Sequence, residues 1–140
     1  MRVIVDTNVL VSGLISGAGP PARIVDAVLD GEIIPVMSDA TLAELEEVLH
    51  RPELQRYFRR ADITVFQFLS GFAQVAQLVR PRASSASIRD ERDRPFLELA
   101  ASRPAPDYLV SGDKDFEGSR YEGVRVISAS LFVESFLKRR

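Results

Sequence analysis

The sequence contains no cysteine and a single histidine, His50. Without cysteine the chain cannot form disulfide bonds, cysteine-ligated zinc or iron–sulfur sites, or a thiol nucleophile. One histidine argues against a multi-histidine metal site and against a Ser-His-Asp triad. We interpret His50 as a helix-end residue near Glu46. Glycine and proline, 8 residues each, are too few for a collagen-like or disordered chain.

Long hydrophobic runs are also missing. The apolar stretches fall far short of the roughly 18 residues that a membrane span needs. Asp6 interrupts the N-terminal apolar run too early for a signal peptide. We therefore expect no membrane association and a cytoplasmic location. The 140 residues, 46% of them hydrophobic, suit one domain over residues 1–140 with a proper core.

The charge is unevenly distributed, although the net charge is only −2. Residues 1–50 contain 2 Lys/Arg and 8 Asp/Glu, whereas residues 51–140 contain 16 and 12. An acidic focus with a basic surround is typical of a metal-dependent enzyme that acts on a polyanion. A set of solvated helices of uneven sign produces the same pattern.

Hydrophobic periodicity predicts alternating strands and helices. Short apolar runs predict strands over residues 3–5, 33–37, 107–111 and 124–127, and a brief strand starting at Val79. Helical patterns lie between them, over residues 7–16, 20–30, 39–50 and 52–60, and after Asp62, Asp93 and Ser128. This order predicts an α/β fold with a mostly parallel sheet and helices on both faces, and such sheets bind ligands at the carboxyl ends of the strands.

The helix expected after Asp62 has the most aromatic pattern in the chain. We expect Asp62 to cap it. We expect six of its residues to face the core: Val65, Phe66, Leu69, Phe72, Ala73 and Ala76.

Two acids directly follow predicted strands. Asp6 comes after residues 3–5, and Asp113 comes after the strand that ends at Ser111. Because the carboxyl ends of parallel strands lie at one edge of a sheet, we expect both acids at that edge.

Three further acids are candidates for the same cluster. Glu44 lies about two turns into the third helix, and Asp93 lies near a helix N-terminus, where the helix dipole favours a negative group. Asp115 follows Asp113 by two residues. Clustered carboxylates repel one another, and a bound divalent cation relieves that repulsion. Mg²⁺ prefers oxygen ligands, can activate water and can stabilise charge on a phosphodiester.

Each of these acids also has a purely structural interpretation. A strand-end acid such as Asp6 is a common helix cap, and an acidic turn is often an ordinary Asx turn. Glu44 has two neighbouring acids in its helix, Glu46 and Glu47, and each of the three fits a solvated position. Asp90 and Glu91 compete with Asp93 for the role of helix cap. The set of acids in an α/β order therefore indicates a metal site more strongly than any one of them.

The basic segment over residues 51–60 is a candidate nucleic-acid contact. It contains four arginines, namely Arg51, Arg56, Arg59 and Arg60. Tyr57 and Phe58 lie between them, so the segment has the residues to bind a phosphate backbone and to stack on a base. Phe58 fits a core position equally well. Lys114 is either a phosphate contact or a solvated turn residue.

Two segments resemble PIN-domain ribonucleases. Residues 3–10 (VIVDTNVL) are similar to the opening strand and acidic signature of that family, and residues 107–116 (DYLVSGDKDF) are similar to its later strand and acidic turn. Between them, residues 42–45 fit the helix that carries the family's glutamate, and residues 89–100 fit the helix of its third acid. The order and spacing hold from residue 2 to about residue 133. The whole resembles the toxin component of prokaryotic toxin–antitoxin pairs.

This resemblance implies a three-layer α/β/α sandwich that cleaves single-stranded RNA with metal-activated water. The positions that match the family's catalytic acids are Asp6, Glu44, Asp93 and Asp113. The implied ligands of Mg²⁺ or Mn²⁺ are Asp6, Asp93, Asp113 and Asp115. Asn8 and Ser111 match the residues that orient the first and last acids. Lys114 and the arginines of residues 51–60 would hold the RNA backbone.

The sequence departs from the family pattern near the third acid. Arg92, Arg94 and Pro95 stand where the family has a more acidic, lysine-bearing stretch. The arginines lower the local negative charge, which weakens metal binding or strengthens RNA binding. They leave open whether Asp90 or Asp93 is the third ligand. Ser111 replaces the usual threonine and keeps the hydroxyl.

The resemblance also implies partners. We expect an antitoxin protein that covers the acidic site, and a homodimer for which Phe66, Phe68 and Phe72 are a candidate interface, although such residues are more often core. Two other functions compete with the nuclease. One is a PIN-like module with a silent site that binds RNA or protein. The other is a phosphatase of the haloacid dehalogenase type, whose Asp-x-Asp motif would require an acid at Asn8.

Overall fold

A six-stranded sheet forms the middle layer of the molecule, in the order β3-β2-β1-β4-β6-β5. The computed structural model describes residues 1–88, 90–112 and 119–137. The strands are β1 (Arg2–Val5), β2 (Ile34–Met37), β3 (Gln77–Leu78), β4 (Tyr108–Ser111), β5 (Arg120–Tyr121) and β6 (Val124–Ser128). Neighbouring strands are parallel except for β5, which is antiparallel to β6. The predicted mostly parallel sheet is confirmed.

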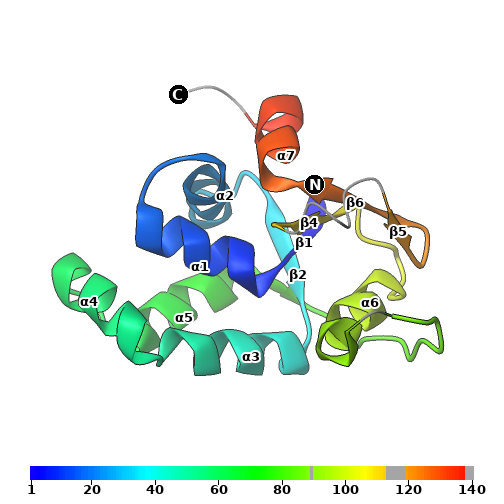
Figure 1. Cartoon of the computed structure of the whole chain (residues 1–140), viewed down its shortest axis with the longest axis horizontal. Helices are drawn as coiled ribbons and strands as arrows, with labels where there is room; N and C mark the ends of the chain where they lie inside the picture. The colour runs from blue at the N-terminus through cyan, green and yellow to red at the C-terminus, as the bar shows by residue number, and fades with distance from the viewer. Residues whose placement is uncertain (89, 113–118, 138–140) are drawn as a thin grey trace.

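Helices cover the two faces of this sheet unequally (Figure 1). The helices are α1 (Thr7–Ser16), α2 (Pro20–Leu29), α3 (Asp39–Leu49), α4 (Pro52–Ala61), α5 (Val65–Val75), α6 (Arg94–Ala100) and α7 (Ala129–Phe136), and the 3-10 turn η1 (Glu91–Asp93) precedes α6. A large core contains residues from α1 to α5 and from α7. A smaller core on the other face contains residues of α6. The predicted α/β/α sandwich is confirmed.

Successive residues of the central strands alternate between the two cores. In β1, Val3 and Val5 belong to the large core and Ile4 belongs to the small one. In β4, Leu109 faces the small core and Val110 the large one. A strand with helices on both faces needs apolar residues at every position, which explains why these runs are continuously hydrophobic.

The first two helices approach each other closely at Gly13. A Cβ atom built on Gly13 would lie 2.5 Å from the carbonyl oxygen of Pro21 and 2.7 Å from a methyl group of Val25. Only glycine therefore allows α1 to pack on α2 at this distance. Gly17 ends α1 with a φ of 64°, a left-handed conformation that glycine adopts without strain.

The prediction for α5 was partly wrong. Thr64 caps this helix, whereas Asp62 ends α4 in a left-handed conformation. Val65 and Phe72 are buried as predicted, but Phe66 is 78% exposed and Ala73 is exposed. The buried stripe is Val65, Phe68 and Phe72, whose spacing of three and four residues is that of one helix face. Phe68 and Phe72 lie in the core, so Phe66 alone of the three candidate interface phenylalanines is exposed.

The short edge strands differ from the predictions as well. The brief strand expected to start at Val79 is β3, which ends one residue earlier, at Leu78. The Val79 N–H still donates to the Met37 oxygen at 2.8 Å. The two-residue strand β5 was not predicted, because so short a run has no readable period. In the part of the chain that is described, no helix is long and apolar enough to cross a membrane.

Candidate active site

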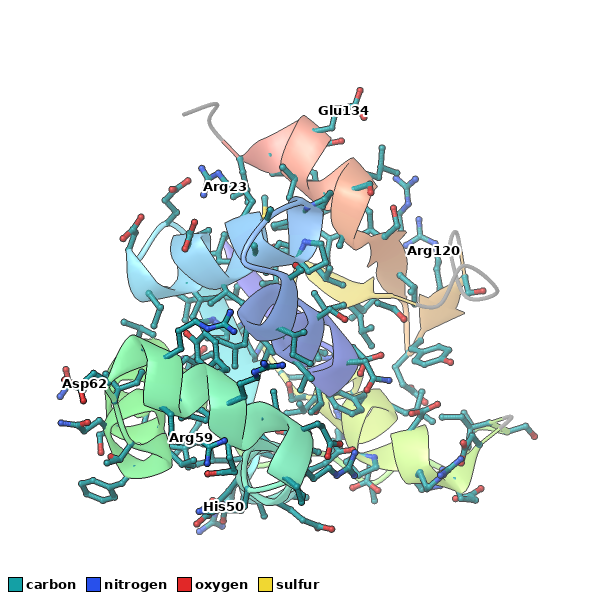
Figure 2. All side chains as sticks on the ribbon, turned by 60° about the vertical axis from the view of Figure 1, so that its left-hand side comes forward. Arg23, His50, Arg59, Asp62, Arg120 and Glu134 are labelled. Carbon is teal, nitrogen blue, oxygen red and sulfur yellow. The ribbon has the colours of Figure 1, made fainter. Side chains whose placement is uncertain are left out.

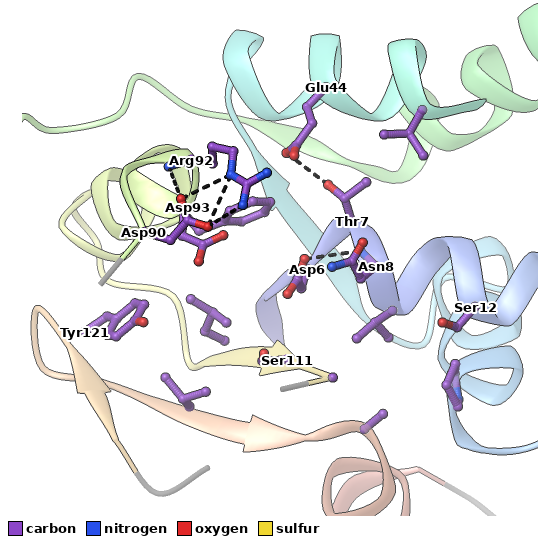
Figure 3. A pocket seen from close by; sticks show the side chains of 18 of the residues that line it. Asp6, Thr7, Asn8, Ser12, Glu44, Asp90, Arg92, Asp93, Ser111 and Tyr121 are labelled. Atoms are coloured by element: carbon purple, nitrogen blue, oxygen red, sulfur yellow. Dashed lines mark hydrogen bonds and ion pairs between the residues drawn. The ribbon is translucent and has the colours of Figure 1, made fainter. Parts of the chain in front are cut away.

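A pocket of about 740 Å³ opens where β1 and β4 end. Its lining includes Asp6, Glu44 and Asp93, which come from three separate elements (Figure 3). The structure therefore brings together three of the four acids predicted to act as a group. Arg51 and Arg92 also line this pocket.

Asp6 connects the central strand to the first helix. Its N–H donates to the Val110 oxygen at 2.9 Å, which extends the pairing of β1 with β4 by one residue. Its Oδ1 accepts the N–H of Asn8 at 3.1 Å and so caps α1. Asp6 is thus a helix cap and a pocket residue at once, and the two interpretations of this acid are compatible.

Glu44 is the one acid of its helix that faces the pocket. It is half-buried, while its rivals Glu46 and Glu47 are exposed. The buried hydroxyl of Thr7 donates to Glu44 Oε2 at 3.2 Å and joins α1 to α3. A capping box of Ser38 and Thr41 fixes the start of α3 two turns earlier.

The two candidates for the third acid, Asp90 and Asp93, have different contacts. Asp90 accepts the backbone N–H of Arg92 at 3.0 Å, and its carboxylate pairs with the Arg92 guanidinium at 2.9 Å. These two hydrogen bonds lower the pKa of Asp90 below its usual range, and the side-chain bond from Arg92 has the larger effect. Asp93 ends η1 and makes no side-chain capping bond to α6. Asp90 and Asp93 both line the pocket, so either of them can serve as its third acid.

The predicted orienting residues lie beside the acids. Ser111 is the last residue of β4, is buried and lines the pocket, and Asn8 lines it from the start of α1. Gly112 also lines the pocket. The remaining predicted residues of this turn, Asp113, Lys114 and Asp115, lie outside the described residues.

The predicted RNA-binding arginines separate into two groups. Arg51, directly before α4, lines the pocket. Arg56, Arg59 and Arg60 are exposed on α4 and do not line it. Figure 2 labels Arg59 among them. Phe58 belongs to the large core, so it does not stack on a base. His50 lies at the end of α3, with Nδ1 2.8 Å from the backbone oxygen of Glu46, as its helix-end interpretation requires.

The donor chemistry of the pocket suits a hard divalent cation. Its acids, together with the Asn8 amide and the Ser111 hydroxyl, offer oxygen ligands, which Mg²⁺ prefers. Among residues 1–88, 90–112 and 119–137, no three acids or histidines approach closely enough to hold an ion.

Sequence reasoning missed two parts of the pocket. Thr7 was given no role in the site, although its position next to Asp6 was an available signal for one. Tyr121 lines the pocket from β5 and packs against the small core. No signal in the sequence indicated it, because β5 itself was not predictable.

One curated relative extends over almost the whole chain. An uncharacterized protein of Methanocaldococcus jannaschii is 28% identical over 147 aligned residues, which cover 99% of this chain and 93% of the relative. No solved structure matches the chain significantly.

The family comparison covers both acid-bearing strand ends. Residues 2–115 match the family model of the PIN domain. PIN domains are typically nucleases and generally use divalent metals such as Mg²⁺. The match includes Asp6, Glu44 and Asp93 together with the strands and helices that position them. The chain therefore belongs to the PIN domain family.

Proposed function

We propose that this protein is a metal-dependent endoribonuclease that cleaves single-stranded RNA. The observation that carries the proposal is the convergence of Asp6, Glu44 and Asp93 on one pocket at the carboxyl ends of parallel strands. Asp6, Glu44 and Asp93 reach this pocket from three separate elements, and carboxylates gathered in one place repel one another. A polyanionic substrate needs these charges neutralised, and a divalent cation does so.

In this proposal Asp6, Asp93, Asp113 and Asp115 hold Mg²⁺ or Mn²⁺. When bound, the cation supplies a Lewis acid for the phosphodiester and lowers the pKa of water. Glu44 is held by Thr7 and positions water or the cation from the α3 side. Asn8 and Ser111 orient the acids at the ends of β1 and β4.

The arginines at the pocket serve the substrate. Arg51 enters from the start of α4, and Arg92 enters from η1 with a side chain that is 89% exposed. Exposed guanidinium groups at the rim of an acidic pocket can bind the phosphates on either side of the cleaved bond. Lys114 is proposed as a further phosphate contact, and Arg56, Arg59 and Arg60 as a more distant basic surface on α4.

The test is RNA cleavage by the purified protein in Mg²⁺ or Mn²⁺ and in EDTA. Asp6→Asn and Asp93→Asn should abolish cleavage. Both variants should remain folded, because asparagine at position 6 caps α1 about as well as aspartate does and the Asp93 side chain makes no capping bond to α6. Glu44→Gln should reduce cleavage strongly, and the matched variant Glu47→Gln, on the exposed side of α3, should leave it unchanged. Cleavage that persists in EDTA or in Asp6→Asn would contradict the proposal. Hydrolysis of p-nitrophenyl phosphate without RNA cleavage would indicate the phosphatase instead.

We further propose that the protein is the toxin of a toxin–antitoxin pair and forms a homodimer in the cytoplasm. An antitoxin that inserts an arginine or lysine among Asp6, Glu44 and Asp93 would neutralise the pocket. Expression in a bacterium should then arrest growth, and Asp6→Asn should remove the arrest. Normal growth with abundant, folded, RNA-cleaving protein would contradict the toxin role. Phe66, exposed on α5, is the remaining candidate for the dimer contact, and Phe66→Ser should shift a dimer to monomer in sedimentation experiments.

A further inference from the structure

A second pocket, of about 880 Å³, lies at the opposite edge of the sheet, where β4 and β6 begin. Three arginines line it, namely Arg103, Arg120 and Arg125, and Figure 2 marks the position of Arg120. Tyr108 and Phe136 also line it. The pocket therefore combines several cations with aromatic rings and contains none of the candidate catalytic acids.

Two of these arginines occupy directly opposite positions on neighbouring strands. Arg120 of β5 pairs with Arg125 of β6 in the antiparallel register, so both side chains project from the same face. Like charges at such positions destabilise a sheet. Among the residues described, no salt bridge involves either arginine. An anion bound between them would remove the repulsion.

The acids near this pocket have other partners. Asp107 Oδ2 accepts the backbone N–H of Arg2 at 2.9 Å, and Glu122 Oε1 accepts the hydroxyl of Ser84. Arg120 donates to the Gly123 oxygen at 3.1 Å, which orients its guanidinium without neutralising it. Asp107 and Glu122 themselves line the pocket, so its three arginines face two acids and the lining keeps a net positive charge for an anionic ligand.

The aromatic side chains extend the row of arginines across the sheet. Tyr108 of β4 pairs with Arg125 in the parallel register and lies on the same face. Its ring centroid is 5.0 Å from that of Phe136, which is 39% exposed. Aromatic rings beside cations are the usual means of binding single-stranded nucleic acid, because bases stack on the rings while phosphates bind the cations.

The β5–β6 hairpin separates this pocket from the candidate active site. Tyr121 and Val126 line the active-site pocket, whereas their neighbours Arg120 and Arg125 line the second one. Adjacent residues of a strand point to opposite faces, so the two pockets lie on the two faces of one hairpin. Because β5 is the edge strand, a flexible chain can pass from Tyr121 to Arg120 around the edge of the sheet.

We propose that the second pocket binds a phosphate and a base of the same single-stranded RNA whose cleaved bond lies at Asp6, an inference that rests on the proposed function. The RNA leaves the active site past Tyr121 and crosses the edge of the sheet at β5. A phosphate then binds between Arg120 and Arg125, and a base stacks on Phe136. RNA long enough to reach both pockets binds more tightly than RNA that fills only the first.

The test measures binding and cleavage separately. Fluorescence anisotropy records the affinity of a labelled trinucleotide and a labelled dodecanucleotide of RNA, both in the Asp6→Asn background so that no cleavage occurs. Arg120→Gln with Arg125→Gln should weaken the dodecanucleotide about tenfold and reduce its log–log salt slope by about 0.7, as expected for one lost phosphate contact. The trinucleotide should be unaffected. The matched control is Arg80→Gln with Arg82→Gln, two exposed arginines outside both pockets.

The outcomes are distinguishable from those of the nuclease assay. Equal weakening of both oligonucleotides, or no weakening of either, overturns the second pocket even if metal-dependent cleavage is found. Selective weakening of the dodecanucleotide supports it even if no cleavage is found. A glutamate-rich peptide that binds at Arg120 and Arg125 while RNA does not would overturn it in favour of a protein ligand.

Discussion

The hydrogen bond from Thr7 to Glu44 joins residues on two helices, 37 positions apart in the sequence. Thr7→Val keeps the shape of the side chain and removes the donor. We expect the free energy of unfolding to fall by about 0.5–1.5 kcal/mol, because Glu44 loses a partner at a partly buried position. We expect RNA cleavage to fall about tenfold, because Glu44 loses its orientation. Cleavage assays and urea unfolding measure the two effects.

Thr7→Ser serves as the control for this variant, since serine keeps the hydroxyl. It should restore most of the cleavage while it loses a buried methyl group and some stability. If Thr7→Val cleaved RNA like the unmodified protein, the bond would be structural only.

The ion pair of Arg92 with Asp90 makes a pH-dependent prediction. Since Arg92 lowers the pKa of Asp90, the pair stabilises the folded protein above the unfolded-state pKa. This stabilisation is lost as the pH falls through the lowered folded-state pKa. Arg92→Gln should raise the pKa of Asp90 toward its usual range, as NMR titration of its side-chain carboxyl carbon can measure.

Arg94→Gln is the matched comparison for that titration. Arg94 lowers the pKa of Glu91 through a side-chain hydrogen bond, so this variant should shift Glu91 and leave Asp90 unchanged. An Asp90 pKa that does not move in Arg92→Gln would show that the exposed pair does not persist in solution.

At the residue scale, the sequence predicts which side chains belong to the site better than it predicts the partners of those side chains. An acid directly after a buried strand is recognisable, so Asp6 was identified from local order alone. The pairing of Asp90 with Arg92 depended on where the Arg92 guanidinium lies, and the Thr7–Glu44 bond depended on how α1 packs near α3. Both are tertiary facts that no local pattern contains.

At the scale of elements, the close contact of α1 with α2 makes Gly13 a sensitive position. Alanine is the better helix former, but its Cβ would meet the Pro21 carbonyl at 2.5 Å. We expect Gly13→Ala to lower the free energy of unfolding by about 1–3 kcal/mol through overpacking.

Gly71 provides the matched control in α5. A Cβ there meets nothing within 4 Å, so Gly71→Ala should raise stability by about 0.4–1 kcal/mol. Denaturant unfolding of both variants gives the sign of each change. A stable Gly13→Ala would mean that α1 and α2 lie farther apart in solution.

The boundaries of most elements were predictable from the sequence, whereas the buried face of α5 was not. Proline at the start of α2 and of α4 marked both helices correctly. In α5, apolar residues surround much of the helix, so hydrophobicity alone could not separate buried Phe68 from exposed Phe66. The buried face is set by packing against the large core, which holds Val65, Phe68 and Phe72.

At the scale of the whole molecule, a cation that binds the folded acids should stabilise the entire fold. Mg²⁺ at about 100 times its dissociation constant should add about 2.7 kcal/mol to the free energy of unfolding. Thermal unfolding with and without Mg²⁺ measures this. Asp6→Asn should lose most of the increase, and Glu47→Gln should keep it. An equal rise in all three proteins would indicate nonspecific salt stabilisation.

The unequal coverage of the sheet has a consequence for motion. The face opposite the large core is closed by α6, a helix of 7 residues, and this helix begins directly after Asp93. A short helix on the smaller core is expected to open in local unfolding before the longer elements of the large core. In hydrogen exchange, the amides of α6 should therefore exchange before those of α1 and β1. Asp6 and Glu44 would then stay in place while local unfolding of α6 moves Asp93. Substrate or metal bound at the site would suppress that unfolding.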